Sequence, residues 1–423
     1  MKASPRRKSE VLSKAMPLEG IRVLDLTRAL SGPFCTMMLA DMGAEVIKVE
    51  PPAGDETRLW GPPFIGEVST YFLSVNRNKK SIAIDLKEKE GVRILKRIVA
   101  SSQVFVENYR PGTTEKLGID YNALRRINRD LVYCSISAFG QTGPSRLIPG
   151  YDIITFAASG MMSITGEPGR PPVKVGVPIS DICSGMYGAY AILGALYRLN
   201  SGKSTRGSRS ASRGEYIDVS MLEGQISWLT HQASAYFATG ENPGPLGSMH
   251  PSIAPYQAFK GSDSEYFVVG VANEQLWIKF CDALGLGSIK KDERFSSNAL
   301  RVEYRVELVE ALSNFFSSKT AAEWVETISA GGVPCGPINK LSKVFEDPQV
   351  VARKMVLECN HPEAGKIKQL AVPYHFGSKE FTIRSPPPTL GEHTDTILSE
   401  SGYSKSKIKS LRDSSVIVKS HVK

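Results

Sequence analysis

The first third of the chain alternates short apolar runs with segments in which apolar residues recur at helical spacing. The runs predict strands at residues 21–26, 45–49, 81–86, 103–107 and 131–136, and the periodicity between them predicts helices at residues 32–42, 88–100 and 122–127. Strands separated by helices usually pair in parallel. We therefore expect an α/β domain built on an open, mainly parallel, Rossmann-like sheet. The turn after the first strand reads TRALSGP, so the GxGxxG motif of dinucleotide-binding proteins is absent.

The pattern changes beyond the middle of the chain. A strand at residues 215–219 and a helix at 221–237 precede a predicted hairpin at 256–271, and helical patterns follow at 274–284, 302–316 and 321–330. We expect a small α+β domain over residues 215–330. It would lie between two parts of the large domain, at residues 16–200 and 335–423, the second ending in a basic tail. The low-complexity basic segment 201–214 predicts a flexible loop.

The net charge of +9 is concentrated in residues 1–15, 201–213 and 401–423, and the rest of the 423-residue chain is mildly acidic. This distribution argues against a dedicated nucleic-acid surface. The apolar run from Met186 to Leu196 is too short to cross a membrane, so we expect no membrane insertion. Residues 1–15 are basic without an apolar core. They predict a basic tail or the remnant of a mitochondrial targeting segment, which leaves mitochondrial and cytoplasmic locations open.

Cysteine and histidine spacing gives no sign of a metal centre. The 6 cysteines include no CxxC pair and the 6 histidines form no metal-binding motif, so neither a zinc site nor a disulfide framework is expected. The GxSxG motif of serine hydrolases is also absent. We expect no metal and no permanently bound cofactor.

A single carboxylate stands out in the apolar stretch GVPISDICSGMYGAYAILGALY, residues 176–197. Asp181 is the only charged residue there, at the turn from an extended run into a long helix. Backbone N–H groups at a helix N-terminus stabilise an anion. Asp181 is therefore either an ordinary helix cap or a desolvated carboxylate nucleophile, and the local pattern does not decide between them.

Two segments combine basic and polar residues near predicted strands. VNRNKKS, residues 75–81, precedes a strand, and VENYRPGTTEKLG, residues 106–118, follows the end of one. Ligands of open α/β sheets bind at the carboxyl ends of strands, so both segments are candidates for the border of one anion-binding crevice. A solvated basic turn explains the first segment equally well.

Several motifs in order together resemble the family III CoA-transferases, the formyl-CoA and carnitine CoA-transferase group. They are PLEGIRVLDLTRALSGPFCTMMLADMGAEVIKVEPP, YFLSVNRNKKSIAIDL, VFVENYRPG, SAFGQTGP, GYDIITFAASGMMSITGE and VGVPISDICSGMYGAYAILGAL. The resemblance runs from about Pro17 to Leu411. Within the family, WGPPF, PSIAPYQAFK, GVPCGPIN and PPPTLGEHT most resemble mitochondrial members that move CoA from succinyl-CoA to glutarate.

The resemblance implies a mechanism and an assembly. Asp181 occupies the position of the family's catalytic aspartate, which attacks the thioester of an acyl-CoA donor and then carries CoA as an aspartyl thioester. A carboxylic acid, here expected to be glutarate or a similar dicarboxylate, accepts the CoA. The family also implies an interlocked homodimer, and CoA enters as a substrate.

Matching positions imply a CoA site. Val75, Asn76, Lys79, Asn108, Tyr109 and Lys116 would line the nucleotide site, and Leu30 would lie near the pantetheine arm. The chain departs from formyl-CoA transferase at Pro51 and Ser137, where that enzyme has an arginine and a lysine. GSMHPSIAP, residues 247–255, replaces its tetraglycine lid.

Two alternatives stay open. An α-methylacyl-CoA racemase shares the resemblance but pairs its aspartate with a histidine near residues 110–114, where this chain reads RPGTT. A non-catalytic CoA-binding scaffold is the second alternative, and the matching context of Asp181 argues against it.

Overall fold

The computed structural model describes residues 16–200, 214–377 and 380–418. The expected segments 1–15 and 201–213 lie outside these residues. The described chain forms two compact units. The first contains residues up to Gly160, Val175–Thr230 and the chain from Lys354, and the second contains Met161–Lys174 and His231–Arg353.

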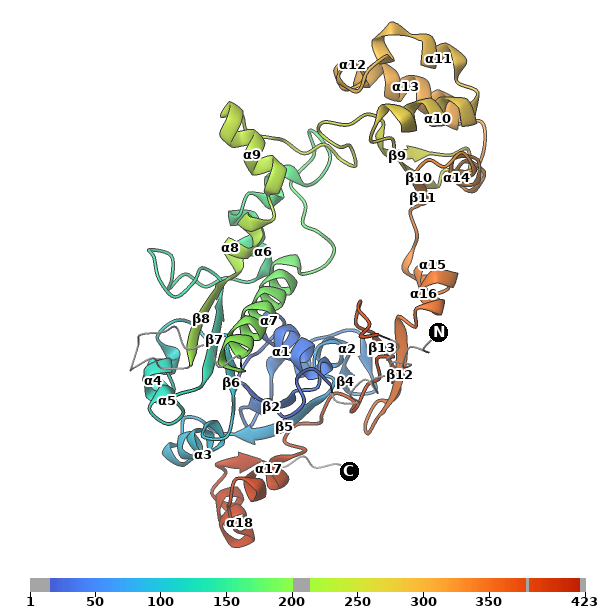
Figure 1. Cartoon of the computed structure of the whole chain (residues 1–423). Helices are drawn as coiled ribbons and strands as arrows, with labels where there is room; N and C mark the ends of the chain where they lie inside the picture. Colours follow the sequence, from blue (N-terminus) through green and yellow to red (C-terminus); the bar gives the residue numbers. More distant parts are fainter. Residues whose placement is uncertain (1–15, 201–213, 378–379, 419–423) are drawn as a thin grey trace, which may run out of the picture. The chain divides into compact units, whose positions relative to one another are not determined.

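The first unit is built on a seven-stranded sheet with the strand order β14-β5-β2-β1-β6-β7-β8 (Figure 1). All neighbours pair in parallel except β14, which is antiparallel to β5. This confirms the predicted sheet. The strands are β1 Arg22–Asp25, β2 Glu45–Glu50, β5 Lys79–Ile84, β6 Val104–Glu107, β7 Val132–Ser137, β8 Glu215–Ser220 and β14 Ile417–Val418.

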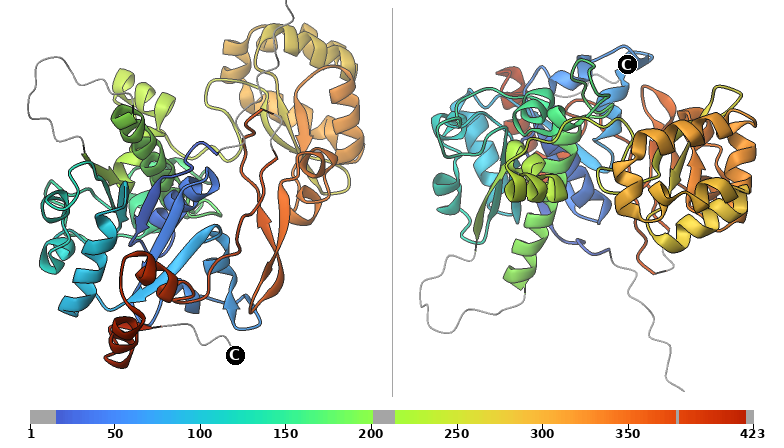
Figure 2. Two further views of the ribbon diagram at one scale, coloured as in Figure 1. Left: turned by 60° about the horizontal axis from the view of Figure 1, so that its bottom comes forward. Right: turned by 90° about the horizontal axis from the view of Figure 1, so that it is seen from above.

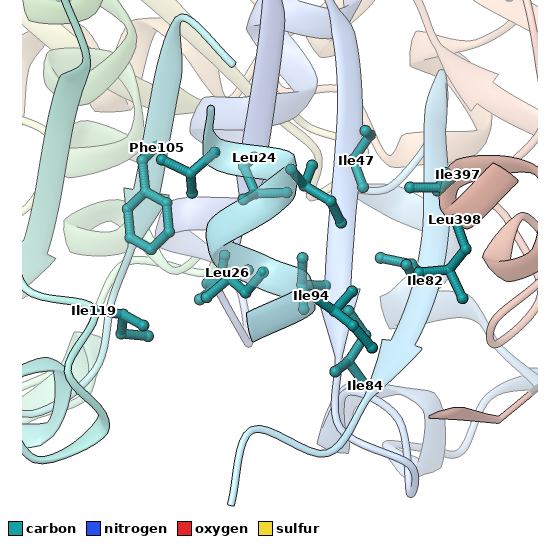
Figure 3. Packing of buried hydrophobic residues seen from close by; sticks show 14 of the residues in the cluster. Leu24, Leu26, Ile47, Ile82, Ile84, Ile94, Phe105, Ile119, Ile397 and Leu398 are labelled. Carbon is teal, nitrogen blue, oxygen red and sulfur yellow. The ribbon is translucent and has the colours of Figure 1, made fainter. Parts of the chain in front are cut away.

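Alternating side chains of the strands lie in two hydrophobic clusters, one on each face of the sheet. On one face, Leu24, Ile47 and Ile82 pack with α3 (Lys89–Val99), α17 (Thr394–Glu400) and α18 (Lys405–Asp413) in one buried cluster (Figure 3). On the other face, Val23, Val46 and Val104 share a cluster with α1 (Ser31–Asp41) and α7 (Ile179–Asn200). Figure 2 shows α17 and α18, in dark red, near the end of the sheet formed by β14 and β5. Burial on both faces explains why the strands read as nearly continuous apolar runs.

Smaller elements complete the first unit. They are the hairpin strands β3 (Phe64–Ile65) and β4 (Val68–Ser69), the hairpin β12 (Val356–His361) and β13 (Gly365–Leu370), and the helices α2 (Thr70–Ser74), α4 (Thr113–Leu117), α5 (Tyr121–Arg125), α6 (Asp152–Ala158) and α8 (Met221–Ser227). The β12–β13 hairpin lies in a region, residues 335–423, for which the sequence analysis predicted no strands.

The second unit is a three-stranded antiparallel sheet, β11-β10-β9, packed against helices. Phe259, Phe267, Phe316 and Trp324 join its buried core. The predicted hairpin and the helices at 274–284 and 321–330 are confirmed. Its elements are α9 (Thr230–Thr239), β9 (Tyr256–Lys260), β10 (Tyr266–Gly270), α10 (Glu274–Leu284), α11 (Gly287–Lys291), α12 (Asn298–Glu303), α13 (Arg305–Phe316), α14 (Ala321–Ala330), β11 (Cys335–Pro337), α15 (Leu341–Val344) and α16 (Pro348–Ala352).

The boundaries of this unit differ from the expected 215–330. Residues 215–230 belong to the first unit because β8 pairs along its length with β7. Residues 335–353 belong to the second because β11 pairs with β10. The single helix expected at 221–237 is two helices, α8 and α9, separated near Thr230, whose φ is 38°.

Helix α7 is longer than the apolar run that suggested it. By length and composition alone its 22 residues could cross a membrane, but half of its most apolar stretch is buried inside the protein. That burial explains the composition: Ala189 and Ile192 pack with the sheet and α1, and Cys183 is buried against Gly224 of α8. A buried core helix passes the same test as a membrane span.

Glycines allow α7 to approach α1 closely. A Cβ atom at Gly185 would lie 2.6 Å from the Ser31 carbonyl oxygen and 3.2 Å from the Cys35 nitrogen. We expect Gly185→Ala to destabilise the protein by about 1–3 kcal/mol through overpacking. Thermal unfolding measures this. Gly194→Ala is the matched control, because nothing lies within 4 Å of that Cβ position on the same helix, and alanine there should be neutral or stabilising. Equal effects of the two substitutions would contradict the packing account.

Candidate active site

Asp181 lies in the first turn of α7, beside the N-terminus of α1. The Ser31 hydroxyl and the Ser31 backbone N–H lie near its carboxyl group and lower the pKa of Asp181. Ser31 is the first residue of α1 and is buried. The carboxyl therefore lies near the N-terminus of one helix and in the first turn of another, and both helix dipoles favour its charged form.

The structure separates Asp181 from the helix-cap role. The backbone N–H of Ser180 donates to Asp152 Oδ1 at 2.7 Å, so Asp152 of α6 satisfies a free donor at the start of α7. Asp181 lies inside the helix, and its carboxyl lies beside Ser31 of a different helix. The acid at the turn is thus available for a function other than capping.

The pKa of Asp181 is raised to about 7, mainly by burial and then by the negative charge of Asp152, and Ser31 opposes this rise. Tyr71 lies close enough that Asp181, after burial, contributes to raising the pKa of the Tyr71 hydroxyl to about 12. A carboxylate that is poorly solvated yet supplied with donors is a competent nucleophile near neutral pH.

The loop between β1 and α1 carries Ser31 to this position. Asp25, at the end of β1, accepts from the Thr27 N–H at 2.9 Å and from the Thr27 hydroxyl at 2.5 Å. Lys48 Nζ donates to the Thr27 carbonyl at 2.9 Å. Ala29 has a φ of 62°, a conformation that non-glycine residues rarely adopt. These bonds hold a strained turn between the sheet and the helix.

Two of the basic residues of the VNRNKKS segment, Arg77 and Lys79, lie inside the protein and are paired with carboxylates. Lys79 has no exposed side-chain surface and donates to Asp25, the Pro33 carbonyl and Asn76 Oδ1 at 2.9–3.1 Å. Burial lowers the pKa of Lys79 to about 8. Arg77 is buried and forms a two-bond pair with Asp41. These cations are balanced internally and do not offer charge to a phosphate.

The remaining positions implied by the resemblance fall into two groups. Val75 and Leu30 form a small buried apolar cluster with Met37, and Ile182, next to Asp181, packs against it. Asn76 is buried and its amide donates to the Phe72 carbonyl at 2.9 Å.

The second group follows β6. Asn108 and Tyr109 are partly exposed after its end, and Lys116 is exposed on α4. The Arg28 guanidinium lies 5.3 Å from the centre of the Tyr109 ring. Leu30 and Val75 thus lie near Asp181, while Asn108, Tyr109 and Lys116 line the neighbouring carboxyl edge of the sheet.

Sequence reasoning did not identify Ser31, Asp152 or Glu107. Ser31 stands in the turn after the first strand, where the rule on carboxyl ends of strands points, and that signal was sufficient to find it. Glu107 ends β6, and its Oε2 accepts from the Tyr109 N–H at 2.8 Å. Burial raises the pKa of Glu107 to about 7. No pattern in the sequence indicated the proximity of Asp152. Among the described residues, no group of three His, Cys, Asp or Glu side chains could hold a metal ion.

The first unit therefore places a half-buried carboxyl between two helix N-termini at the carboxyl edge of a mainly parallel sheet. The model of CoA-transferase family III matches residues 18–394, and the chain belongs to this family. It is 45% identical over 404 residues to the succinyl-CoA:glutarate CoA-transferase of Mus musculus, covering 95% of this chain and 90% of that protein.

Bacterial proteins are also similar. The succinate–glutarate CoA-transferase of Agrobacterium fabrum is 38% identical, covering 93% of this chain and 97% of that protein. A crystal structure of a CAIB/BAIF family protein from Brucella suis superposes with a TM-score of 0.79 at 38% identity, covering 92% of this chain and 100% of the other. The protein is therefore a CoA-transferase, as the motifs predicted.

Proposed function

We propose that this enzyme moves CoA from succinyl-CoA to glutarate or a similar dicarboxylate, through a CoA thioester on Asp181. The observation that carries the proposal is the placement of Asp181, half-buried in the first turn of α7 and beside Ser31, the first residue of α1. The substrate pair is supported by the relatives from Mus musculus and Agrobacterium fabrum, whose names specify succinyl-CoA or succinate together with glutarate.

The reaction follows from a carboxylate nucleophile. A carboxylate oxygen of Asp181 attacks the thioester carbonyl carbon of the donor, the C–S bond breaks, and an anhydride and CoA thiolate form. The thiolate attacks the Asp181 side-chain carbonyl carbon, releasing the donor acid and leaving an aspartyl thioester. The acceptor carboxylate then displaces CoA, and the returning thiolate attacks the acceptor's carbonyl carbon. Asp181 is regenerated and no bond energy is lost to water.

The buried setting of Asp181 suits each step. The apolar cluster of Leu30, Met37 and Val75 with the neighbouring Ile182 limits water near the carboxyl group. The Ser31 donors stabilise negative charge on the side chain whenever an anhydride or thioester there is attacked. Racemisation is less well supported, because it needs a second base near residues 110–114, where the sequence has no histidine.

An acceptor panel tests the substrate class. Purified protein with succinyl-CoA is supplied with glutarate, acetate, formate or oxalate, and the acyl-CoA product is measured by mass spectrometry. We expect glutaryl-CoA to form with the highest kcat/KM. A preference for acetate or formate would overturn the dicarboxylate assignment while leaving the CoA-transferase chemistry intact.

Asp152 gives a prediction about pH. The nucleophile must be ionised, so the acylation rate rises with pH through the Asp181 pKa of about 7. Asp152→Asn removes a like charge and keeps an oxygen to accept from the Ser180 N–H. We therefore expect the acid limb of the kcat/KM profile to move about one unit lower. An unchanged limb in this variant would contradict the electrostatic account.

We also propose a homodimer and a mitochondrial location. The dimer is supported by the family resemblance and by aromatic residues exposed on α7, where Tyr190 and Tyr197 are each 77% exposed. Sedimentation equilibrium tests the dimer, and a monomer at micromolar concentration would contradict it.

The mitochondrial location is supported by the basic sequence of residues 1–15. Imaging of the tagged full-length chain tests this location.

A further inference from the structure

Asn108 holds the loop between β1 and α1, which leads to Ser31, through two hydrogen bonds. Its Oδ1 atom accepts from the Arg28 backbone N–H at 2.8 Å, and its Nδ2 atom donates to the Arg28 carbonyl at 2.8 Å. One amide side chain thus engages both polar backbone groups of one residue, as a neighbouring strand would. The contact joins the end of β6 to the loop that follows β1, which lie 80 residues apart in the sequence.

The end of β6 is itself fixed next to this contact. The buried Glu107 precedes Asn108, and its Oε2 atom accepts from the Tyr109 N–H at 2.8 Å. Backbone positions on both sides of Asn108 are therefore constrained, by the sheet before it and by Glu107 after it. Because its own backbone is fixed, the Asn108 side chain can hold the loop that contains Arg28 in one position.

The loop held by Asn108 contains a residue with strained backbone, Ala29, which needs surrounding contacts to keep its conformation. Ala29 follows Arg28 directly and has a φ of 62°, which costs of order 1 kcal/mol for a residue with a Cβ atom. Thr27, on the other side of Arg28, is held by Asp25 and Lys48. Strained backbone persists where surrounding contacts fix it. Without the two bonds at Arg28, the backbone at Ala29 can relax to a more favourable conformation. Ser31, two residues further on, would then move with the loop.

We propose that Asn108 is a positioning residue for the nucleophile: by holding Arg28, it keeps the Ser31 N–H and hydroxyl directed at Asp181. This inference rests on the proposed role of Asp181. It differs from the role that the family resemblance implies, in which Asn108 contacts the CoA nucleotide. The geometry supports positioning because the amide already spends one acceptor site of Oδ1 and one N–H of Nδ2 on Arg28, a pair of bonds that fixes its orientation toward the loop.

The two roles predict different kinetics for Asn108→Ala. A CoA ligand contributes to substrate binding, so its loss raises the KM for the acyl-CoA. A positioning residue acts on the reacting carboxylate, so its loss lowers kcat by about tenfold with KM changed less than about twofold. Weaker bonds from Ser31 also raise the pKa of Asp181, and we expect the acid limb of kcat/KM to move up by about half a unit.

Asn128→Ala is the matched control. Asn128 Nδ2 donates to the Ser102 carbonyl at 2.6 Å and its Oδ1 atom accepts from the Asp130 N–H at 3.1 Å, so it also holds a loop with both ends of its amide. Its loop follows α5, at the opposite end of β7 from the site. We expect this variant to lose stability without changing the pH profile or kcat.

A double variant tests whether Asn108 acts through Ser31. If it does, Ser31→Ala combined with Asn108→Ala lowers kcat less than the product of the two single effects. Asn108→Ser replaces Asn108→Ala if the alanine variant does not fold.

Three results for Asn108→Ala would each overturn the proposal. They are a raised KM with unchanged kcat, an acid limb of kcat/KM that does not move, and a pH profile equal to that of Asn128→Ala. The wild-type protein is assayed in parallel for the Asp181 thioester. Its absence would refute the proposed function itself, whereas its presence together with any of those results would refute only the role of Asn108.

Discussion

Asp181→Asn abolishes CoA transfer and, at the same time, stabilises the protein above neutral pH. Removal of a covalent nucleophile lowers kcat by at least about 10⁴-fold in enzymes of known mechanism. Asparagine is nearly isosteric and keeps an oxygen that can accept from Ser31, so the site should remain folded. Asp152→Asn, which removes a neighbouring carboxylate, is the control and should retain activity near that of the wild type at pH 8.

The stability effect follows from the raised pKa of Asp181. The folded protein holds the proton up to a pKa of about 7, whereas the unfolded chain releases it near 3.8. Stability contributed by this group therefore falls as the pH rises from about 4 to about 7, and the penalty is complete above that range. We expect Asp181→Asn to be more stable than wild type by about 2–4 kcal/mol at pH 8, with a smaller gain at pH 5.

Thermal unfolding at the two pH values measures this difference. A gain at pH 8 that disappears toward pH 5 confirms that the carboxylate is buried at an energetic cost. Such a cost is expected where function requires a poorly solvated charge. Equal melting temperatures of the two proteins at pH 8 would show that Asp181 is well solvated.

Asp25→Ala should be among the most destabilising single substitutions in the first unit. Asp25 is fully buried, and its charge stabilises the buried ammonium groups of Lys79 and Lys48. It also accepts from Thr27 and Thr36. Removing one partner of a buried ion pair leaves an uncompensated charge and costs about 3–5 kcal/mol. Chemical denaturation monitored by circular dichroism measures the loss.

An exposed ion pair is the control for this experiment. Lys354 donates to Glu380 at 2.7 Å, but the two side chains are 60% and 65% exposed. We expect Glu380→Ala to change stability by less than about 1 kcal/mol. If Asp25→Ala had an equally small effect, the buried cluster would not hold the β1–α1 loop as inferred.

The sheet was predictable because its strands are buried on both faces and separated by helices of clear periodicity. The boundary of the second unit was not. β8 is cut off from β7 by more than 70 residues, and local patterning does not reveal that the two strands pair. Long-range pairing depends on side chains that sequence spacing does not bring together.

The VNRNKKS segment shows a second limit of sequence reasoning. Its lysines and arginine suggested an anion site, yet Lys79 and Arg77 point toward Asp25 and Asp41 on β1 and α1. Burial of a cation depends on an acidic partner distant in the sequence. Asp181 was recognisable from its helix, but Ser31 and Asp152, which tune it, come from two other elements.

The most direct test of the account is to trap the covalent intermediate. Wild-type protein and Asp181→Ala are incubated with succinyl-CoA, treated with hydroxylamine or borohydride, and analysed by intact and peptide mass spectrometry. A modification on the wild-type peptide that contains Asp181, absent from the variant, is the predicted result. An unmodified wild-type protein under conditions where CoA binding is demonstrated would contradict the aspartyl thioester on Asp181.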